Sequence, residues 1–189
     1  MKKLLLLSAV LVLSMPAMAD RLEKYREESR AVVGPFMQQL MAENKKAVTE
    51  GGPESAIQVC KDIAPKMAGD LSRQHGWKLT RVSNKVRNPM LGTPDEWEQK
   101  ALKKMEKRLA KGEKPETLEV AEIVKEPSGK YLRYMKGIVL QPGCVACHGS
   151  ESDISPAVKT RLSEEYPHDQ ATGYKPGDLR GGVSIVNAK

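Results

Sequence analysis

The chain has 189 residues, of which 40% are hydrophobic, with 31 lysines and arginines against 24 aspartates and glutamates. This length suits a single domain with a sizeable core. The formal net charge is +7, but basic residues are spread along the whole chain and interleaved with acidic ones. Such a pattern is typical of a solvated surface and argues against a nucleic-acid-binding protein.

The first 19 residues have the three parts of a secretory signal peptide. Residues 2–3 are lysines, residues 4–13 form an apolar run, and residues 17–19 give the small-x-small pattern that precedes cleavage. The apolar run is shorter than the roughly 20 residues that a membrane-spanning helix needs. We therefore expect cleavage after Ala19, a periplasmic product of residues 20–189 that forms one domain, and no stable membrane span.

The next part of the chain predicts two helical segments. Apolar residues recur at helical spacing over 21–50, where Gly34-Pro35 predicts a kink or a break into two helices. A second apolar stripe runs through 53–71 and places Cys60 on the buried face, with Pro65 expected to bend or end this helix. The stripe residues are Leu22, Tyr25, Val32, Phe36, Leu40 and Met41 in the first segment and Ile57, Cys60, Ile63, Ala64, Met67 and Leu71 in the second.

Residues 77–83 have the short, bounded form of a strand, and residues 87–94 after it predict a loop. A helix is predicted over 93–112 and ends at Gly112. Its start has a capping-box arrangement of Thr93-Pro94 with Glu96.

The C-terminal part alternates strands with one more helix. Residues 117–126 and 130–140 predict two strands joined by a turn. Residues 155–167 predict a short helix that starts at Ser155, and residues 180–187 a final strand. The hairpin is incompatible with a purely βαβ scheme, so the expected fold class is α+β around one mostly antiparallel sheet.

The second of these strands leads directly into QPGCVACHGS, which holds Cys144, Cys147 and His148. C-x-x-C-H is the attachment signal of c-type haem. The two thiols add across the porphyrin vinyl groups, and the imidazole becomes the proximal iron ligand. Because this attachment is made outside the cytoplasm, it agrees with the export signal and requires the cytochrome c maturation machinery. The motif predicts one covalently bound haem c.

Two alternatives to haem stay open at this point. Structural zinc sites usually pair two cysteine knuckles, whereas this chain has one, with Cys60, His75 or His168 as a further ligand. A thioredoxin-like dithiol would follow the first strand and begin a helix in a βαβ unit, which the predicted order lacks. Gly143 and Gly149 predict a loop around the motif instead.

A haem held by His148 has a second axial position, on the distal side of the iron. Cys60 is a candidate because an odd cysteine in an oxidising compartment has no partner once Cys144 and Cys147 are used. A buried free cysteine can also be inert, so the residues alone leave its role open. The other candidates are His75, His168, Met37, Met41, Met67, Met90, Met105 and Met135.

Four segments together resemble a small c-type haem family with a PAS-like fold, whose members occur alone and as sensory parts of signalling proteins. They are AIQVCKDIAPKMA around Cys60, RVSNKVRNP at 81–89, YLRYMKGIVLQPGCVACHG at 131–149 and YPHDQATGYKPGDLRGGVSI at 166–185. They span most of the mature chain in the family's order.

The resemblance implies a PAS-like antiparallel sheet with flanking helices that cradles one covalently bound haem. It also implies that Cys60 is the distal ligand opposite His148. One departure is visible, since Met90-Leu91 stands where the family often has a small residue and an asparagine. If Met90 points inward, it could exchange with Cys60 as the ligand.

Basic residues in the matching segments are candidates to contact the thiolate or the haem propionates. They are Arg81, Lys85, Arg87 and Arg133. A thiolate opposite a neutral imidazole makes the ferric core formally neutral, so burial penalises the reduced state and a low reduction potential is expected.

Two functions follow for such a protein. It is a redox or small-ligand sensor in which Cys60 leaves the iron on reduction, or an electron-transfer carrier whose iron stays six-coordinate. No acid–base residue is nominated, so an enzyme is not expected. No kinase, HAMP or cyclase segment is recognised, so a sensor would need a separate signalling protein, and a carrier would need a redox partner.

Overall fold

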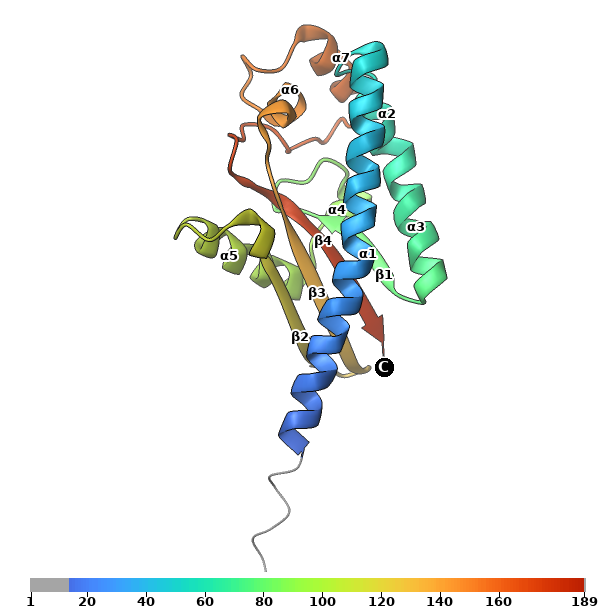
Figure 1. The fold of residues 1–189 in the computed structure, drawn as a ribbon. Coiled ribbons are helices and arrows are strands. Elements are labelled where there is room, and N and C mark those ends of the chain that lie inside the picture. The colour runs from blue at the N-terminus through green and yellow to red at the C-terminus, as the bar shows by residue number, and fades with distance from the viewer. Residues whose placement is uncertain (1–13, 189) are drawn as a thin grey trace, which may run out of the picture.

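The structure, a computed structural model, describes residues 14–188. It confirms the predicted α+β class (Figure 1). The helices are α1 (Ser14–Gly51), α2 (Ala56–Gln58), α3 (Ala64–His75), α4 (Pro89–Gly92), α5 (Glu96–Leu109), α6 (Val145–His148) and α7 (Pro156–Glu165). The strands are β1 (Lys78–Val82), β2 (Glu119–Glu126), β3 (Gly129–Val139) and β4 (Leu179–Ala188). Much of the predicted signal peptide, residues 1–13, lies outside the described residues, so its cleavage stays a prediction.

The four strands form one antiparallel sheet in the order β1-β4-β3-β2. The predicted hairpin of β2 and β3 is present, with Glu126 paired to Gly129 across the turn. The last strand, β4, lies between β1 and β3 and so joins the two halves of the sheet. At the far end of β3 the ladder with β4 is irregular at Ile138/Val139, and the chain then enters the cysteine motif.

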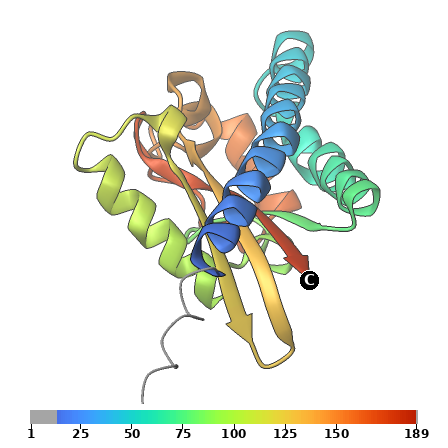
Figure 2. The same cartoon turned by 60° about the horizontal axis from the view of Figure 1, so that its bottom comes forward.

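Helices cover both faces of the sheet (Figure 2). On one face, α1 and α3 pack through residues such as Phe36 and Ala64 against Leu132 and Tyr134 of β3. On the other face, α5 packs through Leu102 and Met105 against its neighbours on β2, β3 and β4. The alternation of β3 side chains between the two faces therefore builds two separate hydrophobic clusters on one sheet.

Helix α1 runs continuously through Pro35, so of the two predicted outcomes, a kink or a break into two helices, the break is wrong. A proline inside a helix removes one backbone hydrogen bond. Here Val32, Val33 and Phe36, on both sides of the proline, are all buried against the sheet, and this packing holds the helix together. Met41, expected on the same face, is 55% exposed.

The second predicted helix does not end at Pro65 but continues to His75. Ahead of the proline, Val59–Ile63 forms a π-helical turn, in which the Ala64 N–H donates to the Val59 carbonyl five residues back. The extra residue in this turn rotates the following side chains relative to the apolar stripe. Ile63 is therefore exposed, although its spacing predicted burial.

The capping box of α5 lies two residues later than predicted. Asp95 is the N-cap: its side chain accepts from the Glu98 N–H at 2.8 Å, and its own N–H donates to Glu98 Oε2 at 2.8 Å. The Thr93 hydroxyl is engaged elsewhere, since it donates to the Pro89 carbonyl at 2.7 Å and so closes the short helix α4.

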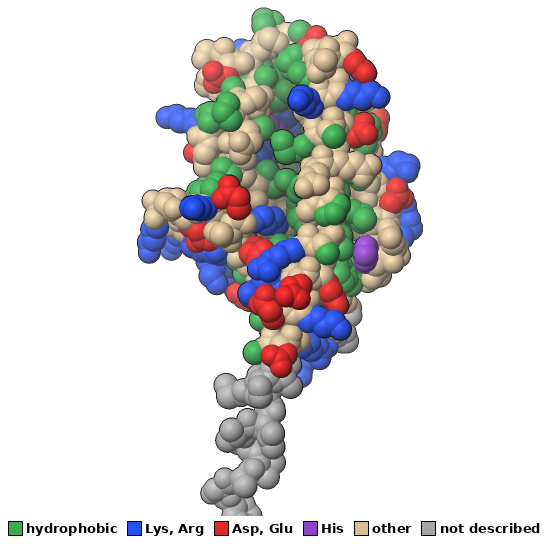
Figure 3. Space-filling model, viewed as in Figure 1, with side chains coloured by type: hydrophobic (Ala, Val, Ile, Leu, Met, Phe, Trp, Pro, Cys, Tyr) green, Lys and Arg blue, Asp and Glu red, His purple; other side chains and the backbone are tan. Residues whose placement is uncertain are grey.

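Hydrophobic side chains run down the middle of the face shown in Figure 3, and charged ones gather around its lower end. No described helix combines the length and the apolar composition needed to cross a membrane.

Candidate functional site

A cavity of about 390 Å³ lies where the end of β3, the cysteine motif, the π-helical turn and β1 meet. This volume is in the range of small-molecule and cofactor sites, roughly 300–1,000 Å³. Three of the residues nominated from the sequence, Cys60, Cys144 and His148, line it together. Segments more than 80 residues apart in the chain thus bring two thiols and one imidazole to the same cavity.

The imidazole of His148 is held through its Nδ1 atom. Nδ1 lies 2.7 Å from the Ala171 carbonyl oxygen, which can only accept, so Nδ1 carries the proton and donates. Arg180 Nε lies 3.3 Å from the same Nδ1 atom, but a protonated nitrogen cannot accept from it. Nε2 is therefore left with a free lone pair, the form in which an imidazole binds a metal.

The surroundings keep His148 neutral. Burial, with the nearby guanidinium groups of Arg87 and Arg180, lowers the pKa of His148 to about 2, although the hydrogen bond to Ala171 acts in the other direction. A neutral imidazole needs no proton removed before it binds a metal.

The backbone of the motif is fixed to the segment that follows α7. The Gly173 N–H donates to the Gly149 carbonyl at 2.7 Å, and the Tyr174 N–H donates to the His148 carbonyl at 3.0 Å. The Tyr174 ring lies edge-on to the imidazole, with 6.4 Å between the ring centroids. The two backbone hydrogen bonds fix the position of α6 without involving the side chain of His148.

The two motif cysteines have different surroundings. Cys144 lines the cavity, whereas Cys147 packs against a small cluster that includes Ile57 and Tyr166, with its Sγ atom 3.8 Å from the Pro53 carbonyl oxygen. Burial raises the pKa of the Cys147 thiol to about 11, against a smaller opposite effect of Arg87. Neither cysteine forms a disulfide. The predicted loop around them contains two short helical turns, a 3₁₀ turn over Pro142–Cys144 and then α6.

Cys60 comes from the π-helical turn and is half-buried rather than fully buried. Asn44 Nδ2 on α1 lies 3.9 Å from the Cys60 Sγ atom, within reach of an N–H···S hydrogen bond. Sequence reasoning did not nominate Asn44. Its distance of 16 residues from Cys60 and its ordinary helical context offered no signal.

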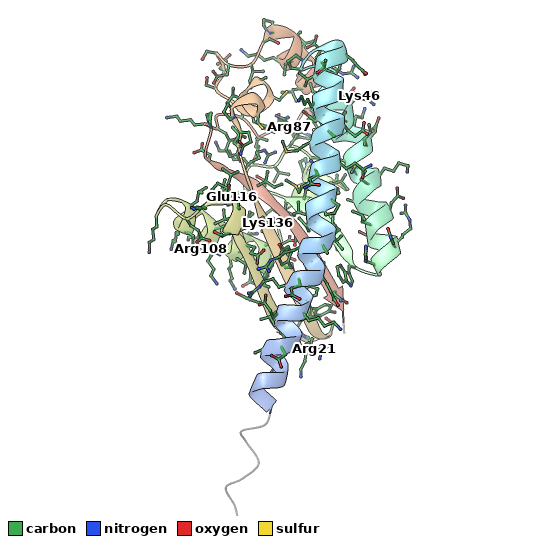
Figure 4. The ribbon with its side chains drawn as sticks, viewed as in Figure 1. Arg21, Lys46, Arg87, Arg108, Glu116 and Lys136 are labelled. Carbon is green, nitrogen blue, oxygen red and sulfur yellow. The ribbon has the colours of Figure 1, made fainter. Side chains whose placement is uncertain are left out.

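Three arginines line the same cavity: Arg81, Arg87 and Arg180. Figure 4 shows Arg87 beneath α6, between the motif and the loop after β1. Arg180 lies over the Tyr174 ring, and burial lowers the pKa of its guanidinium. The sequence nominated Arg81 and Arg87 but missed Arg180.

Gly181 brings two strands close together at the cavity wall. A Cβ atom there would lie 2.3 Å from the Val82 carbonyl oxygen, so only glycine fits. A glycine inside a predicted strand indicates that another backbone approaches closely. Because Gly181 directly follows Arg180, this glycine was the available sign that Arg180 lies near a special position of the sheet.

Comparisons with known proteins identify the family of this chain. The family model described as Tll0287-like matches residues 11–187. The chain belongs to the Tll0287-like family. The prediction of membership in a small haem-protein family is thereby confirmed.

A solved structure similar to this Tll0287-like chain is that of the cyanobacterial heme-protein Tll0287. The TM-score is 0.63 with 23% sequence identity, over 86% of this chain and 96% of that one. At this identity the likeness establishes a shared fold. No curated protein matches the chain in sequence.

The Tll0287-like fold places Arg133 away from the cavity, contrary to its nomination as a propionate or thiolate contact. Its buried guanidinium lies over the Trp97 ring and pairs with Asp95 at 2.5 Å and with Glu98 at 3.6 Å. Arg133 therefore joins β3 to the start of α5 and serves the fold.

The other axial candidates are also away from the cavity. Met90 is 90% exposed and does not point inward. His75 stacks on Trp77 near the end of α3, and His168 is exposed. The remaining methionines of the mature chain do not line the cavity. Within residues 14–188, no group of three or more His, Cys, Asp or Glu side chains gathers as a metal-ion site, so the zinc alternative gains no support.

Proposed function

We propose that this Tll0287-like protein is exported to the periplasm and binds one haem c covalently. In this proposal Cys144 and Cys147 supply the thioethers, His148 is the proximal ligand and Cys60 the distal ligand. The observation that carries it is the oriented imidazole of His148, which has a free Nε2 and lines the same cavity as two thiols. The PAS-like description of the sheet is part of the proposal and is supported by its antiparallel order between helical layers.

The cavity has the chemistry that a haem needs. Much of its wall is apolar, with Leu79, Val82, Ile138 and Leu140 among the lining residues, as suits a porphyrin face. The cavity's three arginines supply cations for the two propionates. Bound haem would supply a one-electron iron couple and an axial position that small ligands can occupy.

The proposed ligand pair predicts a low reduction potential. The Cys60 thiolate would neutralise the ferric core, so that reduction places an extra negative charge in a partly buried site. The Asn44 amide is the donor beside this sulfur, and the arginines of the cavity lie within the same walls. These groups reduce the electrostatic cost of the added negative charge but do not cancel it.

We favour a redox or small-ligand sensor over an electron-transfer carrier. Cys60 belongs to a π-helical turn directly before Pro65, where the regular hydrogen-bond ladder is interrupted. Such turns are frequent at functional sites, and an interrupted ladder makes a ligand easier to displace. A sensor would pass the change to a separate signalling protein. The alternative, a carrier, requires Cys60 to stay bound in both oxidation states and a redox partner.

The test is to produce the protein with a co-expressed cytochrome c maturation system. Haem that stays with the polypeptide after acid–acetone extraction, and is lost in Cys144→Ala with Cys147→Ala, supports covalent attachment. Rapid CO binding to the reduced protein, with loss of sulfur ligation, supports the sensor. A reduced protein that keeps sulfur ligation and excludes CO supports the carrier, and a protein without haem contradicts the proposal.

A further inference from the structure

Asp169 connects Ala171, the acceptor of the His148 imidazole, with Arg87, which binds the cysteine motif. It lies in the loop after α7 and was not nominated from the sequence. Its carboxylate makes two separate contacts. Oδ1 accepts from the Ala171 N–H at 2.7 Å, and Oδ2 accepts from Arg87 Nε at 3.0 Å.

The first contact controls the acceptor of the His148 imidazole. An aspartate that accepts from the N–H two residues later closes a local turn. This turn fixes the backbone at the N–H of Ala171, and the carbonyl of the same residue accepts from His148 Nδ1 at 2.7 Å. Ala171 is itself fully buried, so its carbonyl is shielded from bulk water in this structure.

The second contact reaches the backbone of the motif. Arg87 Nη2 donates to the Cys147 carbonyl at 2.6 Å while its Nε atom binds Asp169. Arg87 and Asp169 have side chains only 9% and 10% exposed, so the ion pair is largely shielded from water. Removal of one partner would leave a buried, unpaired charge, which the fold accommodates poorly.

We infer that Asp169 is a positioning residue for the proximal ligand. It holds Ala171, whose carbonyl accepts from the imidazole, and, through Arg87, the carbonyl of Cys147, the residue that directly precedes His148. The Nδ1 proton and the ring orientation of His148 are then both set by one carboxylate. Groups that hydrogen-bond to a metal-ligating histidine in this way raise its basicity and fix its tautomer. This inference rests on the proposed function for its haem-dependent part alone.

A more basic imidazole stabilises ferric iron more than ferrous iron. Loss of Asp169 therefore raises the midpoint potential of the bound haem. Each tenfold loss in the preference of His148 for ferric iron corresponds to about 59 mV for a one-electron couple. Substitution of a group that hydrogen-bonds to a metal ligand typically costs about 10- to 100-fold in metal affinity.

The experiment compares Asp169→Ala and Asp169→Asn with Asp178→Ala. Asp178 is a matched control, since it also accepts from a backbone N–H in this loop, that of Lys175 at 2.7 Å, but contacts neither Arg87 nor Ala171. Spectroelectrochemistry gives the midpoint potential, and the low-spin ferric g-values report ring orientation. We expect both Asp169 variants to shift upward in potential, Asn less than Ala, with Asp178→Ala unchanged.

A second readout uses the haem-free protein. Nitrogen-15 NMR of its three histidines gives the imidazole tautomers, with His148 assigned by His148→Gln. We expect a dominant Nδ1–H tautomer in the wild type and loss of that dominance in Asp169→Ala, which removes the acceptor of the Ala171 N–H. A loss of tautomer preference in a protein that never takes up haem would support the positioning role while contradicting the proposed function. An unchanged tautomer in Asp169→Ala, or an unchanged potential in the loaded variants, would overturn the inference.

Discussion

The imidazole of His148 and the carbonyl of Ala171 are joined by a hydrogen bond of 2.7 Å across 23 residues of sequence. This contact gives the histidine one defined tautomer, with Nε2 free at the cavity. The histidine of the C-x-x-C-H motif is therefore held in one orientation.

The Asn44 amide is expected to withdraw electron density from the Cys60 sulfur and so to affect the midpoint potential of the bound haem. Its amide lies 3.9 Å from Sγ, and a hydrogen bond to a thiolate stabilises the electron-rich reduced state. Asn44→Ala should therefore lower the midpoint potential and shift the thiolate-to-iron charge-transfer band of the ferric spectrum to lower energy. Gln38→Ala, on an exposed position of the same helix, is the control and should change neither. Equal spectra for Asn44→Ala and wild type would show that this amide does not act on the sulfur.

Substitution of Arg180 should affect the midpoint potential of the haem, whereas substitution of Arg133 should affect the stability of the fold. Arg180 lines the cavity, so Arg180→Met should change the midpoint potential of the loaded protein while the fold remains. Arg133 pairs with Asp95 and Glu98, so Arg133→Met should lower the free energy of unfolding by about 3–5 kcal/mol with no change of potential. Urea unfolding and spectroelectrochemistry on both variants measure the two effects. A change of potential in Arg133→Met alone would reverse the assignment of the two residues.

Gly181 should tolerate no side chain. Its Cβ would lie 2.3 Å from the Val82 carbonyl oxygen, so Gly181→Ala must separate β1 from β4 at the cavity wall. We expect a loss of about 1–3 kcal/mol in stability, together with reduced haem loading. Gly143→Ala, within the motif, is the control because a Cβ there meets nothing within 4 Å. Thermal unfolding of the two variants would give the same midpoint if the strand approach were not tight.

The Glu119 carboxylate should make stability depend on acid pH. Burial alone would raise its pKa, but hydrogen bonds from Arg30 and Tyr134 lower the pKa of Glu119 below its usual value. A pKa lowered by folding adds stability above the unfolded-state pKa, near 4.3, that is lost as pH falls below it. Glu119→Gln should be less stable than wild type at pH 6, by about 1.5–3 kcal/mol, and the gap should narrow at pH 3. A stability difference between Glu119→Gln and wild type that is the same at pH 3 and pH 6 would exclude the ionised Glu119 carboxylate as its cause.

Local patterns in the sequence predicted the order and type of the elements well. The hairpin of β2 and β3, the helix after Ser155 and the final strand all follow from period-two or helical spacing and from turn residues. The helix ends expected at Pro35 and Pro65 are absent, because tertiary packing accommodates Pro35 and a π-helical turn precedes Pro65. Neither the packing nor the π-helical turn can be recognised from local residue spacing.

The candidate site was predictable only where side-chain type carried the signal. Cys60, Cys144 and His148 were found in this way, and they share one cavity. The acceptor at Ala171 is a backbone atom, so no residue type announces it. Arg133 was misplaced because alternate residues of a strand face opposite sides: Leu132 and Tyr134 face α1, whereas Arg133 faces α5.

The most direct test of the central claim is the ferric absorption spectrum of the matured protein beside that of Cys60→Ala. We predict a low-spin wild-type spectrum with a thiolate-to-iron charge-transfer band, and loss of that band in the variant while haem stays covalently attached. A wild-type spectrum that Cys60→Ala leaves unchanged would contradict ligation by His148 and Cys60.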